Sequence, residues 1–406
     1  METPDFTVPY THHPAPPSVG QDTPDSCDNQ SASGNFSESS GVLFFSGGTA
    51  LKEAARVLAR RVQTTHIITT FDSGGSTAAL RRVIDIPAMG DIRSRILALA
   101  NTSNQRVKNL VSVLEYRLPQ SNAPVTAKDV FADFVQGSHP RMLCLDSEDY
   151  EWVKHRLMDV EARLSADFRH EDASIGNMVL VAGYFAHNHC LQPAAREMCD
   201  RVQARGAVHA VSEMPAQLAV RLESGETIIG QHRFTGKKGH FVQSPIADIW
   251  LVHDNAGTLV SASAEATALA AIARAQLVCY PIGSFFSSIA ANLLVRGVGQ
   301  AVAQAQCPKI FIPNPGADPE LRGHTLVSQM EFLLRLLRAD APNEPAENLI
   351  SHILVDTHNT HYSGDVPHAW LEQHNITLLD KPFVNPTDPP FIPGENLARV
   401  LEDFLG

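Results

Sequence analysis

Short apolar runs alternate with amphipathic stretches along most of the chain. The clearest example is Val42–Phe45, which leads into a glycine turn and then into a stretch whose Leu51, Leu58 and Val62 share one helical face. The other runs of this kind are His66–Phe71, Leu277–Ile282, Lys309–Pro313 and Ile350–Val355. Strands that alternate with helices in this way predict βαβ units. We therefore expect an α/β fold with a mostly parallel, Rossmann-like sheet flanked by helices.

One region departs from this alternation. Three extended runs follow one another there, with a Ser-Gly turn between the last two: Ala207–Val211, Gln217–Leu222 and Thr227–Gly230. Ser-Gly between alternating runs is a turn signal, so we expect a small antiparallel β insertion, a hairpin, over residues 207–250. Residues 119–170 are polar with helical periodicity, and we expect them to form a helical cap or lid.

The first forty residues differ in composition from the rest of the chain. They are rich in Pro, Ser, Asn, Gln and Asp and have few large apolar groups. Such a segment buries too little apolar surface to offset the entropy lost on ordering. We predict a disordered acidic tail over residues 1–40 and one α/β domain over residues 41–406.

Composition narrows the class of protein. The 406 residues are 44% hydrophobic and 19% charged, with a net charge of −12, which argues against a general nucleic-acid coat. The cysteines form no CxxC pair, and the start of the chain lacks the pattern of a signal peptide. The longest apolar stretches, such as Met178–Ala186, are about half of the ~20 residues that a membrane helix needs. We expect a cytoplasmic protein that binds neither nucleic acid nor membranes.

The net charge hides a local asymmetry. The first forty residues hold six acidic and no basic residues, whereas residues 41–118 hold eleven basic and five acidic ones. A basic segment inside an acidic chain suggests a ligand of opposite charge. Three of the candidate phosphate-binding elements described below lie in this segment, although Arg56, Arg60 and Arg61 are expected on a solvated helix face.

The first candidate site is the turn after Val42–Phe45, with Gly47, Gly48 and Thr49. Between a strand and a helix, unpaired backbone N–H groups and the helix dipole favour an anion, and glycine lets the backbone approach a phosphate. The turn is neither GxGxxG nor a P-loop. A plain tight turn, with Thr49 as a helix cap, therefore stays an alternative.

The second candidate turn contains Asp72, Gly74, Gly75 and Ser76. Asp72 lies at the carboxyl end of a predicted parallel strand, where ligands of open α/β sheets bind. An acid there can hold a ribose hydroxyl, a base edge or a metal ion, and the glycines add backbone donors for a diphosphate. The alternative is that Asp72 only caps the next helix.

Further candidate residues lie near the starts of two predicted helices. Gly90-Asp91 precedes a helix on which Arg93 and Arg95 are expected away from the apolar face of Ile92, Ile96 and Leu99. Arg93 suits a phosphate, whereas Asp91 and Arg95 are spaced for a helical ion pair. Asn177 follows Ser174 at the start of another helix, where it either caps the helix or contacts a ligand.

A fourth loop follows the strand at Leu277–Ile282. Its polar residues and glycine are Gly283, Ser284, Ser287 and Asn292. Hydroxyls and backbone N–H groups in such a loop can hold a phosphate. No Gly-x-Ser-x-Gly elbow precedes a serine, which argues against a hydrolase triad.

These elements together resemble one family, the 2-phospho-L-lactate transferase (CofD)-like proteins, which include a gluconeogenesis-factor branch. The resemblance covers most of residues 41–316 and rests on the order and spacing of five pieces: Ser46–Leu51, Asp72–Arg81, Gly90–Arg93, Ser174–Asn177 and Ile282–Val295. It implies that the glycine turn, the Asp72 turn and the Ser284 turn converge on one small phosphorylated ligand.

The resemblance also implies two kinds of activity. In the transferase branch, a phospholactyl-type group passes from a nucleotide diphosphate donor to an alcohol acceptor with Mg²⁺ assisting; the regulatory branch binds a UDP-sugar without catalysis. Asp72-Ser73 stands where the family usually has an acidic pair, which weakens a Mg²⁺ site at Asp72. The 207–250 insertion is more similar to the regulatory branch.

We favour a transferase with Asp72 and Arg93 as catalytic residues, and we keep the UDP-sugar-binding regulator as the alternative. Asp72 would hold Mg²⁺ or orient the acceptor hydroxyl, and Arg93 would offset charge on the phosphoryl oxygens. The glycine turns and Ser76 would hold the phosphates. The assembly is left open, with a homodimer as one option.

Overall fold

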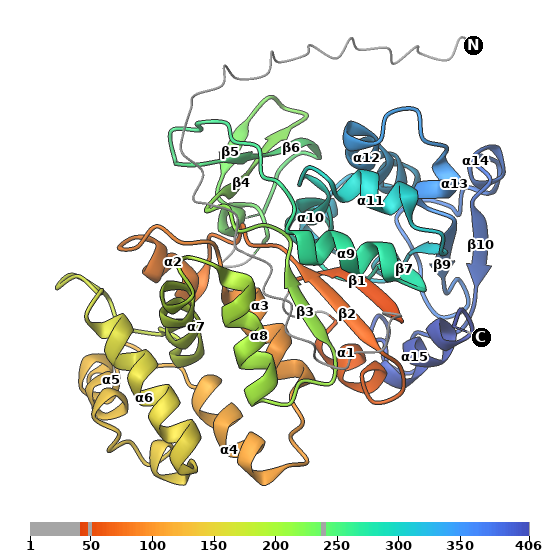
Figure 1. The fold of residues 1–406 in the computed structure, drawn as a ribbon. Helices are drawn as coiled ribbons and strands as arrows, with labels where there is room; N and C mark the ends of the chain where they lie inside the picture. Colours follow the sequence, from red (N-terminus) through yellow and green to blue (C-terminus); the bar gives the residue numbers. More distant parts are fainter. Residues whose placement is uncertain (1–40, 48–50, 237–240, 406) are drawn as a thin grey trace. The chain divides into compact units, whose positions relative to one another are not determined.

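The centre of the fold is a parallel sheet. The computed structural model describes residues 41–47, 51–236 and 241–405. Within them, seven strands lie in the order β10-β9-β8-β7-β1-β2-β3, and each neighbouring pair is parallel. The strands, seen in Figure 1, are β1 (Val42–Ser46), β2 (Thr64–Ile68), β3 (Ala207–Ala210), β7 (Leu277–Tyr280), β8 (Lys309–Phe311), β9 (His352–Val355) and β10 (Thr377–Asp380). This confirms the predicted α/β class.

Both faces of the sheet are covered, which explains why its inner strands read as continuous apolar runs. In β1, Val42 and Phe44 join one buried cluster, and Leu43 and Phe45 join the other. Successive side chains of a strand point to opposite faces, so a strand between two cores needs apolar residues at every position.

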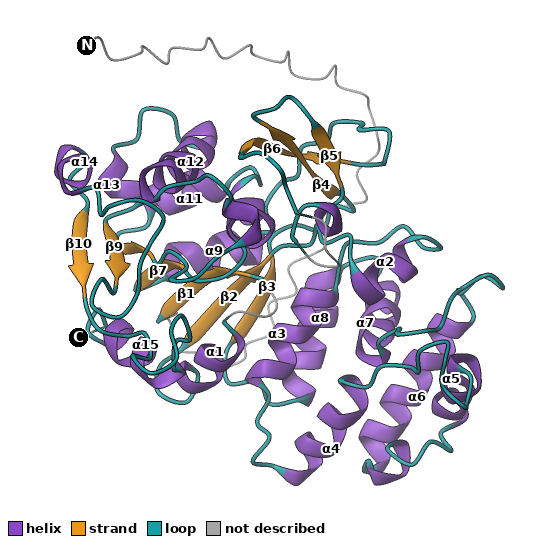
Figure 2. Cartoon of the chain, turned by 180° about the vertical axis from the view of Figure 1, so that it is seen from behind, coloured by secondary structure: helices purple, strands orange, loops and turns teal. Residues whose placement is uncertain are grey.

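Helices from the first half of the chain, together with the last one, pack in the Val42 cluster. They are α1 (Lys52–Leu58), α2 (Gly75–Arg81), α3 (Gly90–Leu99), α4 (Gln105–Leu114), α5 (Ala127–Gln136), α6 (Ser147–Glu161), α7 (Ile175–Ala186), α8 (Leu191–Arg201) and α15 (Gly394–Glu402), with the short η1 (Met142–Cys144). Figure 2 shows α4–α7 as a helical group on the β3 side of the sheet, beyond α3 and α8. Residues 119–170 are thus largely helical; their role as a cap or lid stays a prediction.

The second half of the chain supplies most of the other cluster. Its helices are α9 (Ala266–Arg274), η4 (Phe285–Ala290), α10 (Ala291–Leu293), α11 (Val298–Gln304), α12 (Leu326–Asp340), α13 (Ala346–Leu349) and α14 (His368–Gln373), with the short η5 (Pro319–Leu321). None of the helices that the structure describes is both long and apolar enough to cross a membrane.

The small antiparallel sheet is present, but it starts later than expected. It has the order β5-β4-β6, from β4 (Gln217–Leu222), β5 (Thr227–Ile229) and β6 (Ile246–Val252), and η2 (Gln231–Arg233) lies between the last two in sequence. The segment at Ala207 belongs instead to β3, the parallel edge strand next to β2. Its alternating burial is that of an edge strand, which sequence periodicity does not distinguish from a hairpin strand.

The strand order reverses between β1 and β7. From β1 the chain proceeds to β2 and β3 on one side, and from β7 it proceeds to β8, β9 and β10 on the other. The connections after β1 and β7 therefore diverge at the carboxyl ends of these two strands. In open α/β sheets this is the place where a crevice forms and ligands bind.

Candidate functional site

The first glycine turn follows β1 at this switch point. A Cβ placed on Gly47 would come within 2.3 Å of the Ser288 Oγ atom of η4 and within 3.2 Å of the Asp91 Oδ2 atom of α3. Only a residue without a side chain allows such a close approach. The turn, η4 and the start of α3 therefore meet here. Gly48 and Thr49, the other predicted phosphate contacts of this turn, lie outside the described residues.

A buried arginine braces the same turn. Arg95 donates hydrogen bonds from Nη2 to the Gly47 carbonyl oxygen (2.8 Å) and from Nη1 to the Leu51 carbonyl oxygen (3.3 Å). Burial lowers the pKa of Arg95 to about 10, while the charge of Asp91 acts in the opposite direction, so the guanidinium stays charged at neutral pH. The expectation that Arg93 and Arg95 lie away from the core is wrong, because both side chains are buried among hydrogen-bond acceptors.

The second turn is shaped by Asp72 itself. Its Oδ1 atom accepts a hydrogen bond from the Gly74 backbone N–H (2.8 Å), which is the geometry of an Asx turn. The N-cap of α2 is Gly74, without a side-chain cap, and Gly75 has a φ of +55° and open space around its Cα. Asp72 thus orders the turn rather than capping the helix. Its Oδ2 atom has no hydrogen bond to any residue that the structure describes.

Two neighbours hold the Asp72 turn in place. Arg81 of α2 donates a hydrogen bond to the Asp72 carbonyl oxygen (3.1 Å). From the antiparallel insertion, η2 brings His232 to the turn, where its Nδ1 atom lies 2.9 Å from the Ser73 Oγ atom. The insertion therefore places a hydrogen-bonded Ser–His pair directly beside Asp72.

Asn177 lies where α2, α3 and α7 meet. A Cβ on Gly90 would lie 2.8 Å from the Thr77 Oγ1 atom and 3.9 Å from the Asn177 Nδ2 atom. Asn177 is buried, and its Oδ1 atom has no hydrogen-bond partner among the described residues. Buried polar atoms are rarely left in this state in proteins. This orphaned acceptor therefore belongs to a residue beside the start of α3, the helix that also carries Asp91.

Arg93 supports the start of α7. Its Nη1 atom donates to the Ser174 Oγ atom (2.6 Å), and this oxygen caps α7 by accepting from the Asn177 N–H (3.4 Å). The Ser174 N–H donates in turn to the Ser76 Oγ atom (2.8 Å). Burial, followed by the charge of Arg117, lowers the pKa of Arg93 to about 10. These contacts make Arg93 a positioning residue, and its direct contact with a phosphate stays a prediction.

Ser174→Ala tests this support. The variant removes the acceptor of both the Arg93 guanidinium and the α7 N-terminus, so we expect the free energy of unfolding to fall by about 1–2 kcal/mol. Urea denaturation measures it. In the control, Ser112→Ala removes a hydroxyl that donates only within its own helix, to the Asn109 carbonyl oxygen (2.7 Å), and should change stability by less than about 0.5 kcal/mol. Equal losses in the two variants would contradict the role of Ser174.

The fourth loop is already occupied by carboxylates of the chain. At the start of η4, the Phe285 N–H donates to Asp318 Oδ2 (3.0 Å), and the N–H groups of Phe286 and Ser287 donate to Glu320 Oε2 (2.9 and 2.8 Å). The Ser287 hydroxyl donates to Glu320 Oε1 (2.5 Å). Anions are favoured at such a position, and η5 supplies them from within the chain. Both donors of Ser287 thus serve Glu320 in this structure, and the contact of Ser287 with a phosphate stays a prediction.

The rest of the fourth loop holds Ser288 in place. The fully buried Asn292 donates from Nδ2 to the Ser288 carbonyl oxygen (2.7 Å), and its Oδ1 atom has no partner among the described residues. The Gly283 N–H donates to the Asn314 Oδ1 atom (2.8 Å). Ser284 precedes η4 without a side-chain cap. Gly283 and Asn292 thus position the loop that touches Gly47, and their contact with a phosphate stays a prediction.

The predicted residues from separate segments come together around two centres. Gly47, Asp91 and the Ser288 loop meet at the switch point, Asn177 lies beside Gly90 at the start of α3, and Ser76 links the Asp72 turn to α7. Sequence reasoning missed Arg95, Ser288, His232 and Glu320. Ser288 belongs to the serine-rich loop after Leu277–Ile282, so the local sequence could have indicated it. His232 and Glu320 come from segments whose sequence pattern does not indicate a site.

The Asp72 turn offers Mg²⁺ a carboxylate but not a complete set of protein ligands. The described residues contain no converging group of three or more His, Cys, Asp and Glu side chains. However, Mg²⁺ is commonly bound through one or two carboxylates, with water and substrate phosphates completing its shell. The Oδ2 atom of Asp72, which accepts no hydrogen bond from a described residue, suits either that arrangement or the role of a base, one at a time. A bound Mg²⁺ would supply charge neutralisation of phosphate oxygens.

A parallel sheet with a switch point between β1 and β7 and helices on both faces defines a doubly wound α/β protein. Residues 42–381 match the family described as "2-phospho-L-lactate transferase CofD", and the chain belongs to this family. This membership supports a phosphotransferase-like role.

Named relatives belong to the gluconeogenesis-factor group. The chain is 26% identical over 294 residues to the "Gluconeogenesis factor" of Bacillus subtilis, covering 70% of each chain. It is 25% identical over 297 residues to the "Gluconeogenesis factor" of Halalkalibacterium halodurans, covering 72% of each. The fold is similar to a crystal structure of a Bacillus halodurans member of the UPF0052 family, with a TM-score of 0.64 and 21% identity, over 91% of this chain and 99% of that chain.

Proposed function

We propose that this protein transfers a phosphorus-containing group from a nucleotide diphosphate donor to an alcohol acceptor. The observation that carries the proposal is the meeting of Gly47, Asp91 and Ser288 at the switch point, with the Asp72 turn at the end of the adjacent strand β2. Two glycine turns at neighbouring strand ends suit a diphosphate, because glycine lets the backbone of a strand–helix turn approach a phosphate closely.

Charge supports an anionic ligand at this place. Arg95 and Arg81 each donate to the backbone of one turn, and Arg93 lies behind the start of α7. Buried guanidinium groups keep their charge and are weakly screened by solvent. They therefore favour phosphates at the turns without having to touch them.

The chemical step needs a base beside the acceptor. The acceptor oxygen forms a bond to the terminal phosphorus of the donor, the bridging P–O bond breaks, and a nucleoside monophosphate leaves with the bonding electrons. The acceptor's proton passes to the free Oδ2 atom of Asp72. The His232–Ser73 pair, beside this carboxylate, positions the acceptor hydroxyl. Such transfers depend chiefly on positioning and electrostatics.

A second function is favoured by Ser73. It occupies the position of the family's second acid, and the similar proteins from Bacillus subtilis and Halalkalibacterium halodurans carry the name gluconeogenesis factor. Without that carboxylate, the same site suits a regulator that binds a nucleotide sugar, such as a UDP-sugar, and releases it unchanged.

Nucleotide release separates the two functions. The purified protein is incubated with Mg²⁺, a panel of nucleotide diphosphate donors and alcohol acceptors, and the nucleoside monophosphate formed is quantified by chromatography. A transferase gives acceptor-dependent release with at least one donor. No release with any donor, together with saturable binding of a UDP-sugar in calorimetry, would replace the transferase by the regulator.

A further inference from the structure

A pocket of about 240 Å³ lies at the opposite edge of the sheet from the candidate site. Its walls come from α1 and the residues after it, from the carboxyl end of α3, and from the segment before β3. Because β2 and β3 are parallel to β1, the segments before them lie at the amino edge of the sheet, whereas the glycine turns follow the strands at the carboxyl edge. The pocket and the candidate site are therefore separate places.

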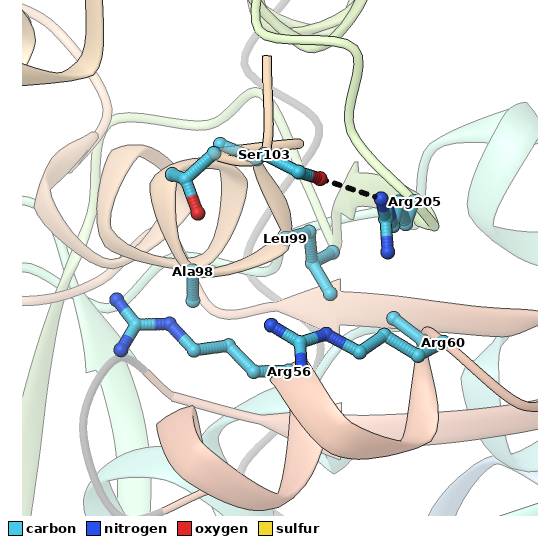
Figure 3. A pocket seen from close by; sticks show the side chains of 9 residues that line it. Arg56, Arg60, Ala98, Leu99, Ser103 and Arg205 are labelled. Atoms are coloured by element: carbon cyan, nitrogen blue, oxygen red, sulfur yellow. Dashed lines mark hydrogen bonds between the residues drawn. The ribbon is translucent and has the colours of Figure 1, made fainter. Parts of the chain in front are cut away.

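Three arginines surround this pocket. Figure 3 shows Arg56 and Arg60 extending along one side, with Arg205 and Ser103 on the other. The Arg205 guanidinium is held by Asn101 Oδ1 (2.7 Å) and by Ser103 Oγ (3.1 Å), both neutral acceptors. The described residues that line the pocket include no Asp or Glu.

Arg56 and Arg60 differ from their neighbour Arg61 in one respect. Arg61 forms ion pairs with Glu395 and Glu402 of α15, whereas neither Arg56 nor Arg60 forms an ion pair or side-chain hydrogen bond with any residue that the structure describes. The positive charge of Arg61 is thus matched within the chain, and that of the other two is not.

Helix dipoles offset only part of the positive charge of the three pocket arginines. The carboxyl ends of α1 and α3 face this region, and each carries roughly half a negative charge. Three guanidinium groups carry three positive charges, so a surplus of about two remains at the pocket. Guanidinium forks bind phosphate oxygens with paired hydrogen bonds, and Thr102 and Ser103 offer hydroxyls beside them.

We propose that this pocket binds a small phosphorylated metabolite carrying at least two negative charges. Its volume of about 240 Å³ is below that of typical pockets for drug-sized ligands and suits a short phosphate ester better than a whole nucleotide sugar. The net charge of −12 argues against nucleic acid as the occupant. This site is additional to the proposed transferase site and does not depend on it.

Pyrophosphate titration at low ionic strength tests the proposal by calorimetry. The triple variant Arg56→Gln, Arg60→Gln, Arg205→Gln should weaken one binding event at least about tenfold and leave any event at the glycine turns unchanged. The control is Arg399→Gln, an exposed arginine of α15 without a described partner, which should bind like the wild type. All three pocket arginines are exposed, and an unchanged thermal midpoint of the triple variant confirms that it is folded.

Three results would overturn the pocket proposal: unchanged pyrophosphate binding in the triple variant, an equal loss in Arg399→Gln, or binding of a short single-stranded RNA at these arginines in place of pyrophosphate. Failure of the transferase proposal gives a different pattern. The glycine-turn event would then be absent from the wild type, while the event that depends on the arginines would persist.

Discussion

Asp72→Asn should lower kcat/KM for the transfer reaction by about a thousandfold, within the range that a positioned general base contributes. The asparagine keeps the Oδ1 acceptor for the Gly74 N–H (2.8 Å), so the Asx turn is retained. The substitution replaces Oδ2, the atom that would take the acceptor's proton, with an amide that cannot accept it. Steady-state kinetics with the donor and acceptor found in the release assay measure the change.

Asp85→Asn is the matched control for Asp72→Asn. Asp85 is an exposed acid of the same segment, and the substitution makes the same change in net charge. It should leave kcat/KM within about threefold of the wild type. If Asp72→Asn also kept its activity, the base assignment would be wrong. If it lost stability but not activity, Asp72 would serve only the turn.

Glu320→Ala should lower the free energy of unfolding by about 3 kcal/mol or more. Glu320 is fully buried and accepts from the N–H groups of Phe286 and Ser287 and from the Ser287 hydroxyl. Each buried donor left without an acceptor costs about 1–3 kcal/mol. Chemical denaturation measures the loss. Glu320→Gln, which keeps an acceptor oxygen at the start of η4, should lose much less.

The same residue gives stability a pH dependence. Burial, and next the charge of Asp318, raise the pKa of Glu320 to about 7 from an ordinary 4.5. The folded state then binds a proton more tightly than the unfolded state. The stability contribution is thus complete below pH 4.5 and is lost as the pH rises through about 7. Wild type should therefore lose stability relative to Glu320→Gln across this window. A difference that does not vary with pH would contradict the raised pKa.

The parallel sheet and its turns were within reach of sequence reasoning because each depends on local pattern. Val42–Phe45 is apolar at every position since both sheet faces are covered, and Gly47 is a glycine since Ser288 and Asp91 approach it. Burial on both sheet faces and close backbone packing each restrict the residue type at a position, so both are visible in the local sequence. The edge strand β3 was misassigned because its four residues alternate in burial like those of a hairpin strand.

The partners of the site were harder to predict because they are distant in the chain. Ser287 pairs with Glu320 and Ser73 with His232, and nothing in the local sequence marks either contact. The sequence pattern predicts Arg95 away from the apolar face of its helix, at a spacing that suits an ion pair with Asp91. It is buried because two backbone carbonyls of the glycine turn accept its hydrogen bonds. Long-range hydrogen bonding of this kind becomes visible only in three dimensions.

The central claim is that a nucleotide diphosphate binds at the switch point between β1 and β7. A crystal structure of the protein with a bound nucleoside diphosphate tests it most directly. We expect the diphosphate at the carboxyl edge of the sheet, within hydrogen-bond distance of backbone N–H groups of the Gly47 and Gly74 turns. A diphosphate bound elsewhere, for instance only among Arg56, Arg60 and Arg205, with the switch point empty, would contradict it.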